Sequence, residues 1–129
     1  MTQLQREAAQ REKKTVAIAA VQDFPPGARV EVRIGSRKIA IFNVDGHYYG
    51  IHGICPHQFA PLAEGRLQGT VICNAETGWQ KKWAYDGEII VCPGHAMEFH
   101  VKTGKAIGYD LRLRTYEVLV EDGEVKLVL

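Results

Sequence analysis

The sequence predicts an all-β domain of the sandwich or barrel-like type, and three observations support this prediction. From residue 15 onward, short runs of β-branched and apolar residues alternate with turn residues. Three Asp-Gly dipeptides stand between such runs, and each favours a hairpin turn. No helical period is found after residue 15, so we expect no long helix there.

The chain divides into a short extension and a single domain. Residues 1–14 are polar and charged, and we expect a polar N-terminal extension that is a frayed tail rather than a helix. Neither an internal repeat nor a linker interrupts residues 15–129. We therefore expect one domain over 15–129.

Within this domain, turn residues delimit the expected strands. Phe24-Pro25-Pro26-Gly27 forms a turn that leads into a strand over 28–34, and Gly35-Ser36 turns the chain into a strand over 38–44. The Asp-Gly dipeptide favours the type I′ turn, whose twist matches that of a hairpin. Three hairpins are therefore expected, at Asp45-Gly46, Asp86-Gly87 and Asp122-Gly123.

The composition excludes several functional classes. The chain has 129 residues, 46% of them hydrophobic, and a formal net charge of +1, which indicates neither disorder nor nucleic-acid binding. The longest apolar run, residues 16–21, is too short to span a membrane, and no signal-peptide pattern opens the sequence. We therefore expect a cytoplasmic protein. Three cysteines are too few for a disulfide framework, so metal ligands, nucleophiles or core residues are expected instead.

Two short segments each present a cysteine and a histidine, namely Cys55-Pro56-His57 and Cys92-Pro93-Gly94-His95. Two thiolates and two imidazoles can hold a [2Fe–2S] cluster in which histidines bind one of the irons. Cys55 and Cys92 would hold one iron, and His57 and His95 the other, where the added electron settles. The same four side chains also form a zinc ligand set, so a structural zinc site is the alternative.

The residues around these segments resemble the cluster-binding loops of Rieske-type [2Fe–2S] ferredoxins. The first loop is Cys55-Pro56-His57-Gln58-Phe59-Ala60-Pro61-Leu62, followed by Gly65; the second is Cys92-Pro93-Gly94-His95-Ala96-Met97-Glu98-Phe99, followed by Thr103-Gly104-Lys105-Ala106. The resemblance extends from about residue 16 to residue 129. It implies the Rieske fold, in which three antiparallel sheets hold one cluster per chain at one tip.

The chain departs from this family pattern in two places. The family usually has glycine where this chain has Ala96, which is a small change. In addition, 34 residues separate His57 from Cys92, roughly twice the usual gap. A rival ligand pair, Cys73 and Glu76, lies within this gap. We reject it because a carboxylate is a poor substitute for an imidazole and the other loop features all lie at 92–99. Cys73 is expected to be a small buried hydrophobe or a free thiol.

The long gap indicates an inserted hairpin near residues 70–88. Period-2 alternation would place Trp79, Lys81, Trp83 and Tyr85 on one face of this hairpin. Two interpretations stay open: the aromatic residues pack on the domain, or Trp79, Lys81, Lys82 and Trp83 form a docking surface. The remaining histidines, at 47, 52 and 100, are expected to be solvated or hydrogen-bonded rather than metal ligands.

The resemblance implies a one-electron carrier rather than an enzyme. We expect a ferredoxin component that accepts electrons from a flavin-dependent reductase and delivers them to a terminal oxygenase. The exposed edges of His57 and His95 would be the exit point, rimmed by Gln58, Phe59, Pro61 and Met97. The alternatives are a small redox subunit of a larger oxidoreductase such as nitrite reductase, or, in another class, a structural zinc-binding or interaction module.

The resemblance also predicts a low reduction potential. High-potential Rieske proteins carry a disulfide between the two loops, but the matching positions here are Ala60 and Gly94. Those proteins also direct a serine and a tyrosine hydroxyl at sulfur atoms, where this chain has Met97 and Phe99. Because hydrogen bonds to sulfur stabilise the reduced state, their absence predicts a potential of roughly −150 mV.

Overall fold

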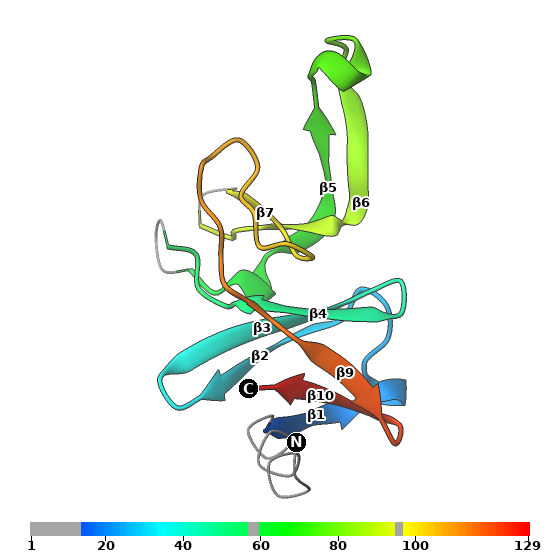
Figure 1. Cartoon of the computed structure of the whole chain (residues 1–129), viewed down its shortest axis with the longest axis vertical. Helices are drawn as coiled ribbons and strands as arrows, with labels where there is room; N and C mark the ends of the chain where they lie inside the picture. Colours follow the sequence, from blue (N-terminus) through cyan, green and yellow to red (C-terminus); the bar gives the residue numbers. More distant parts are fainter. Residues whose placement is uncertain (1–13, 57–59, 95–96) are drawn as a thin grey trace, which may run out of the picture.

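The computed structural model describes residues 14–56, 60–94 and 97–129. Ten strands and three short 3₁₀ helices are assigned within these ranges, in agreement with the predicted all-β class (Figure 1). The elements are β1 (Thr15–Ala20), η1 (Val21–Asp23), β2 (Arg29–Ile34), β3 (Arg37–Val44), β4 (His47–His52), η2 (Leu62–Glu64), β5 (Arg66–Ile72), η3 (Ala75–Thr77), β6 (Lys82–Val91), β7 (Glu98–His100), β8 (Thr115–Tyr116), β9 (Val118–Glu121) and β10 (Glu124–Val128).

The strands form three antiparallel sheets, as the resemblance implied. The sheets have the orders β1-β10-β9, β2-β3-β4-β8 and β5-β6-β7. The first two lie together at the end of the molecule that carries both labelled termini, and the third lies beyond them (Figure 1). The sheet that contains β3 is thus the middle layer of the molecule.

Strand β3 shows why two hydrophobic cores form. Its residues from Ile39 to Val44 are all buried, and successive side chains of a strand point to opposite faces. Ile39 and Ile41 enter the core shared with β10, whereas Ala40 and Phe42 enter the core beneath the third sheet. A continuous apolar run is therefore needed to pack a central strand on both faces.

Two of the three predicted Asp-Gly hairpins are confirmed. Asp45-Gly46 joins β3 to β4, and Asp122-Gly123 joins β9 to β10. In both turns the aspartate and the glycine have positive φ angles, as a type I′ turn requires.

The predicted hairpin at Asp86-Gly87 is wrong. Residues Lys82–Val91 form one continuous strand, β6, which pairs with β5 on one side and with β7 on the other. Here Tyr85 and Gly87, rather than Asp86 and Gly87, have positive φ angles. The residues before and after Asp86-Gly87 both pair with β5, and this pairing overrides the local turn preference and leaves a bulge.

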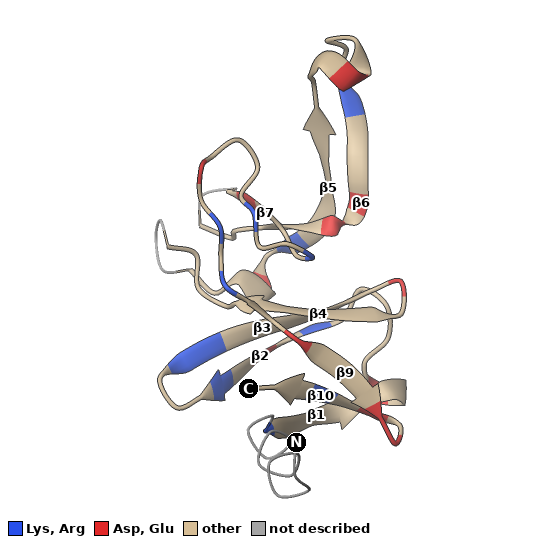
Figure 2. Cartoon of the chain, viewed as in Figure 1, with Lys and Arg blue, Asp and Glu red and all other residues tan. Residues whose placement is uncertain are grey.

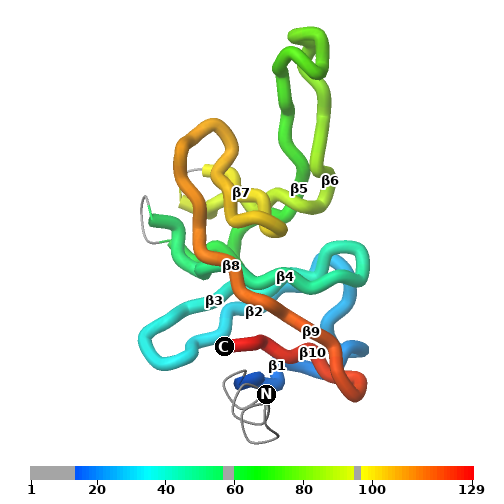
Figure 3. Tube along the Cα trace, viewed as in Figure 1, coloured from blue at the N-terminus to red at the C-terminus, as the bar shows by residue number. Residues whose placement is uncertain are grey.

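The long gap between the two loops forms a two-stranded projection, which we call the arm (residues 70–84). It is a hairpin of β5 and β6, as predicted, but its turn lies at residues 73–81. Asn74 caps η3 through a hydrogen bond from the Thr77 backbone N–H. The arm is the outer part of β5 and β6 and projects away from the rest of the molecule (Figure 3).

The strand begins only at Lys82, so the predicted alternation from Trp79 to Tyr85 does not occur. Trp79 and Lys81 precede the strand, and Trp79 and Tyr85 have positive φ angles. These two breaks end the regular period of 2.

Candidate metal centre

The two predicted thiol ligands lie in the same hydrophobic core. Cys55 and Cys92 have exposed fractions of 0% and 1%, and both belong to the core that contains Leu62 and Phe99. They come from separate parts of the chain: Cys55 follows β4, and Cys92 follows β6. The fold thus brings together two cysteines that are far apart in sequence.

The same backbone hydrogen bond closes both loops. The N–H of Cys55 donates to the carbonyl of Ala60 at 2.9 Å, and the N–H of Cys92 donates to the carbonyl of Met97 at 2.8 Å. Each bond spans five residues, so each cysteine begins a loop of the same size. His57 and His95 belong to these loops but lie outside the described residues, as do Gln58, Phe59 and Ala96.

A close backbone contact holds the two loops against each other. A side chain at Gly65 would place its Cβ atom 1.9 Å from the carbonyl oxygen of Val91, the residue before Cys92. Only glycine therefore permits the chain after the first loop to pass this closely beside the start of the second.

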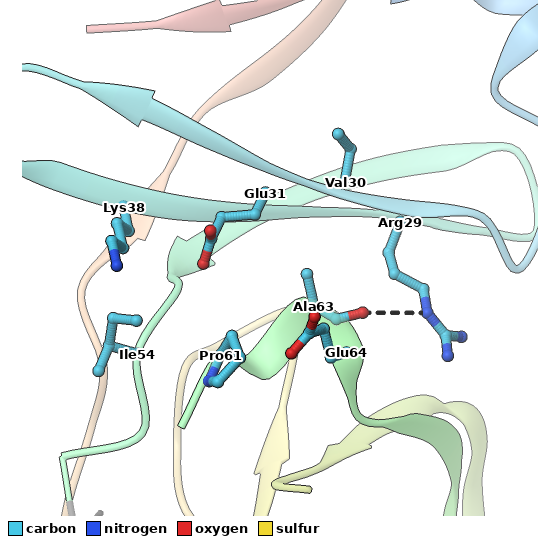
Figure 4. A pocket seen from close by; sticks show the side chains of 8 residues that line it. All are labelled: Arg29, Val30, Glu31, Lys38, Ile54, Pro61, Ala63 and Glu64. Carbon is cyan, nitrogen blue, oxygen red and sulfur yellow. Dashed lines mark hydrogen bonds between the residues drawn. The ribbon is translucent and has the colours of Figure 1, made fainter. Parts of the chain in front are cut away.

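Arg29 fixes the same segment from the middle sheet. Its Nη2 donates to the carbonyl of Gly65 at 2.6 Å, and its Nε donates to the carbonyl of Ala63 at 3.3 Å. Figure 4 shows Arg29 extending from β2 beside a pocket that Pro61 and Glu64 line on the opposite side. The sequence gives no signal for this role, because an arginine in a strand that alternates charged and apolar residues is typical of a solvated face.

Met97 and Phe99, which have no hydroxyl group, lie in or against the core that contains both cysteines. Phe99 is fully buried in the core beside the cysteines, and Met97 and Ala60 pack against that core. Their apolar side chains contribute to the core that contains both cysteines.

Cys73 lies apart from this core. It is exposed at the end of β5, so the interpretation as a small buried hydrophobe is wrong and the thiol is accessible. Glu76, its partner in the rejected ligand pair, is also exposed, in η3.

The other histidines fit their expected role. His47 is exposed at the start of β4, and His52 is half-buried at its end. His100 donates from Nε2 to Oε1 of Glu88 at 2.7 Å, and Lys102 approaches the other oxygen of this carboxylate at 3.2 Å. These contacts, with the hydrogen bond from His100 first, lower the pKa of Glu88 from its ordinary value.

The two tryptophans of the arm face solvent, with exposed fractions of 72% for Trp79 and 57% for Trp83. The interpretation in which the aromatic residues pack on the domain is therefore wrong for both tryptophans. Tyr85, which is 45% exposed, follows the arm, and its ring lies 4.8 Å from the ring of His100 in β7. Charges of both signs are interspersed over the described chain (Figure 2). No helix among the described residues is long and apolar enough to cross a membrane.

The described part of the ligand set fits a [2Fe–2S] cluster. Thiolates are the soft donors that iron–sulfur clusters require, and two buried cysteines at the starts of matching loops provide them. Among the described residues, no group of three or more His, Cys, Asp or Glu side chains gathers into another metal site.

Comparisons with known proteins agree with this chemistry. Residues 14–117 match the family described as the Rieske [2Fe-2S] domain. The ferredoxin component of naphthalene 1,2-dioxygenase/salicylate 5-hydroxylase systems from Ralstonia sp. is 31% identical over 111 residues, which cover 84% of this chain and 89% of the relative. The 3-phenylpropionate/cinnamic acid dioxygenase ferredoxin subunit from Escherichia coli (strain K12) is 35% identical over 107 residues, or 81% and 84% of the two chains.

Solved structures show the same fold. The carbazole 1,9a-dioxygenase ferredoxin of Nocardioides aromaticivorans IC177 superposes with a TM-score of 0.67 at 25% identity, covering 89% of this chain and 96% of that one. A chain from a complex of reduced oxygenase and oxidized ferredoxin in carbazole 1,9a-dioxygenase has a TM-score of 0.69 at 28% identity, covering 88% and 92%. A Mycobacterium tuberculosis protein described as a nitrite reductase small subunit has a TM-score of 0.68 at only 16% identity, covering 91% and 96%, and shows the fold alone.

Proposed function

Because the chain belongs to the Rieske [2Fe–2S] domain family, we propose that it is a one-electron carrier with the ligands Cys55, His57, Cys92 and His95. The observation that supports this ligand set is the burial of both thiols in one core, each at the start of a loop with the same closure. The two histidines follow within these loops. When bound, the cluster supplies reversible uptake of a single electron.

The side chains around the site exclude water from the thiols and leave the loops accessible to a partner. Leu62, Phe99 and Met97 exclude water from the thiol side, because they pack in or against the core that contains both cysteines. Pro56 and Pro93 are exposed on the loops themselves and leave the loop side of the site open to a redox partner.

Purification of the protein tests this assignment. We expect a brown protein with two irons and two acid-labile sulfides per chain, and a Rieske-type electron paramagnetic resonance signal after reduction. Colourless protein that contains zinc would instead support the structural zinc site and overturn the proposal.

Two variants test the ligands. His95→Cys should change the electron paramagnetic resonance spectrum, because a thiolate would replace an imidazole on the histidine-bound iron. Glu76→Gln should leave the spectrum unchanged, since Glu76 is exposed in η3. The opposite result would favour the rival pair of Cys73 and Glu76.

The electron partners are a reductase and a terminal oxygenase. The relatives at 31% and 35% identity are ferredoxin components of oxygenase systems, and one structural neighbour forms part of a complex between an oxygenase and its ferredoxin. The likeness to nitrite reductase small subunits extends only to the fold. The oxygenase system is therefore the better supported context.

The arm forms a docking surface for the terminal oxygenase, with Trp79, Lys81, Lys82 and Trp83 as its contact residues. Strand β6 runs from the arm to Val91 and so leads into Cys92, and one strand thus connects the docking surface to the loop through which the electron leaves. Exposed tryptophans are typical of residues that anchor protein interfaces.

The Trp83 side chain is held in position by contacts within the chain. Its Nε1 donates to Oδ1 of Asp86 at 3.0 Å, and its ring lies where a Cβ atom at Gly69 would approach it to 2.8 Å. An aromatic ring fixed in this way loses little conformational entropy on binding.

Replacement of both tryptophans tests the docking surface. Trp79→Ala with Trp83→Ala should weaken binding to the oxygenase at least about tenfold, since each interface tryptophan commonly contributes more than 1 kcal/mol. The cluster spectrum should not change. Val120→Ala serves as the control, because Val120 is an exposed apolar residue in β9. Unchanged affinity in the folded double variant would exclude the docking surface.

A further inference from the structure

The arm joins the third sheet through an unusually large bulge, which we call the elbow (residues 85–88). Gln68 pairs with Ile89 and Thr70 pairs with Ala84, so four residues of β6 oppose Gly69 alone. An ordinary bulge places two residues opposite one. The trace of β6 bends in this region, where the arm leaves the sheet (Figure 3).

The elbow has a strained backbone. Four non-glycine residues in the described chain have positive φ angles: Asp45, Trp79, Tyr85 and Asp122. The two aspartates belong to type I′ turns, which tolerate aspartate. Tyr85 is a bulky residue for which such a conformation is a genuine outlier. Strain of this kind persists only where the surrounding structure imposes it.

Glu88 and His100 make side-chain contacts across the elbow. The Glu88 carboxylate accepts a hydrogen bond from His100 Nε2 at 2.7 Å, and the His100 ring lies 4.8 Å from the Tyr85 ring, centroid to centroid. The N–H of Val101 also donates to the Glu88 carbonyl at 3.0 Å. His100 thereby fixes both ends of the elbow, and it belongs to β7, next to the core residue Phe99.

A further contact connects the elbow to the middle sheet. Lys102 pairs with the second oxygen of Glu88 at 3.2 Å, and its Nζ lies 5.7 Å from the centroid of the Tyr49 ring in β4. The cation is thus shared between the elbow and a neighbouring layer. The elbow is anchored to two sheets rather than to its own strand alone.

We infer that Glu88 and His100 are positioning residues that set the direction in which the arm holds Trp83 and Trp79 relative to the cluster loops. The inference rests on the proposed function of the arm as a docking surface. An arm held in one orientation can contact a partner at the same time as the loop that begins at Cys92, whereas a loosened arm must be ordered on binding.

The exposed thiol of Cys73 permits a direct test. Cys73 lies at the end of β5, whereas Cys55 and Cys92 are buried. A nitroxide label on Cys73 of the cluster-containing protein can therefore report the distance distribution between the arm and the reduced cluster. We expect a narrow distribution in the native protein and a broader or displaced one in Glu88→Ala and His100→Leu.

His100→Gln is the rescue variant, because its amide can still donate to Glu88, and it should retain a distribution closer to the native one than His100→Leu does. Glu76→Ala is the control, as an exposed carboxylate in η3. A native distribution in both Glu88→Ala and His100→Leu would overturn the inference.

Oxygenase turnover then distinguishes the proposed docking surface from the positioning role of Glu88 and His100. Loosening the elbow should raise the KM for this ferredoxin about five- to tenfold and leave kcat and the cluster spectrum unchanged. If the arm broadens but KM stays the same, the docking surface is wrong while the positioning role of Glu88 and His100 stands.

Discussion

At the scale of single residues, Gly65 lies where the backbone leaves no room for a side chain. A Cβ atom at Gly65 would lie 1.9 Å from the Val91 carbonyl oxygen, so Gly65→Ala must displace the backbone immediately before Cys92. We expect a loss of stability of about 3 kcal/mol, at the upper end of typical overpacking penalties, together with a reduced iron content. Chemical denaturation and iron analysis would measure both effects.

Gly50→Ala is the matched control for this prediction. The same added methyl group would lie 3.2 Å from its nearest neighbour, the Val118 Cγ2 atom. It should therefore cost less stability and leave the iron content unchanged. Equal losses in the two variants would show that the contact with Val91 has no special role.

The Glu88 carboxylate gives a prediction about pH. Its pKa is lowered in the folded protein, first by the hydrogen bond from His100 and then by Lys102, against the opposing effect of burial. A lowered folded-state pKa means that the stabilisation is fully present above about pH 4.5, the ordinary value, and is lost as the pH falls through the folded-state pKa.

The stability difference between the native protein and Glu88→Gln should therefore be largest near pH 7 and shrink below about pH 4.5. Thermal unfolding of both cluster-containing proteins across this range measures it, and the acid sensitivity of the cluster itself is common to both. A difference that does not depend on pH would contradict the role assigned to the Glu88 carboxylate.

Residue chemistry also sets what the sequence can predict. Cys55 and Cys92 were predictable because a thiol followed by proline and histidine is a distinctive local pattern, repeated in two places. The pair of Glu88 and His100 was not predictable, since the two residues lie twelve positions apart and meet only through the pairing of β6 with β7.

At the scale of elements, the Asp-Gly dipeptides show how far local preference reaches. At Asp45-Gly46 and Asp122-Gly123 the flanking residues pair with each other across the turn, Val44 with His47 and Glu121 with Glu124. At Asp86-Gly87 the residues before and after the dipeptide instead both pair with β5. Long-range pairing is invisible in a short sequence window, and it converted the expected turn into a bulge.

The element that carries Trp83 gives the next prediction. A Cβ atom at Gly69 would lie 2.8 Å from the Trp83 ring and 2.7 Å from the Ala84 carbonyl oxygen. Gly69→Ala should push the indole away from β5, increase its exposure to solvent and cost about 1–3 kcal/mol of stability. Stronger acrylamide quenching of tryptophan fluorescence would detect the change.

Val120→Ala provides the control for Gly69→Ala, because Val120 is exposed in β9, outside the arm. It should leave the quenching of Trp83 as in the native protein. If Gly69→Ala also leaves quenching unchanged, the indole does not rest on β5 in solution.

At the scale of the whole molecule, the layered arrangement separates stability from function. The middle sheet contributes one face of β3 to the core shared with β10 and the other face to the core that contains Cys55 and Cys92. The loops that begin at these cysteines are thus built on a packed support, a common way of holding functional loops. The sequence indicated the layers through the resemblance, but neither the direction of the arm nor its elbow.

The reduction potential depends on this whole environment. Two neutral imidazole ligands in place of thiolates raise the potential above that of all-cysteine clusters, and hydrogen bonds to sulfur raise it further. Phe99 and Met97 line the cysteine core with apolar groups, and Ala60 and Gly94 cannot form the disulfide of the high-potential proteins. The disulfide and the two hydroxyl donors of the high-potential proteins are therefore absent at these four positions.

We accordingly expect a midpoint potential near the low end of the Rieske range, roughly −150 mV, in a redox titration followed by electron paramagnetic resonance. Met97→Ser and Phe99→Tyr, which supply hydroxyl groups at the positions discussed above, should move the midpoint upward if either hydroxyl reaches a sulfur atom. Val120→Ala, in β9, should leave it unchanged. A native midpoint above about +100 mV, well inside the range of the high-potential proteins, would show that donors other than these two side chains stabilise the reduced state.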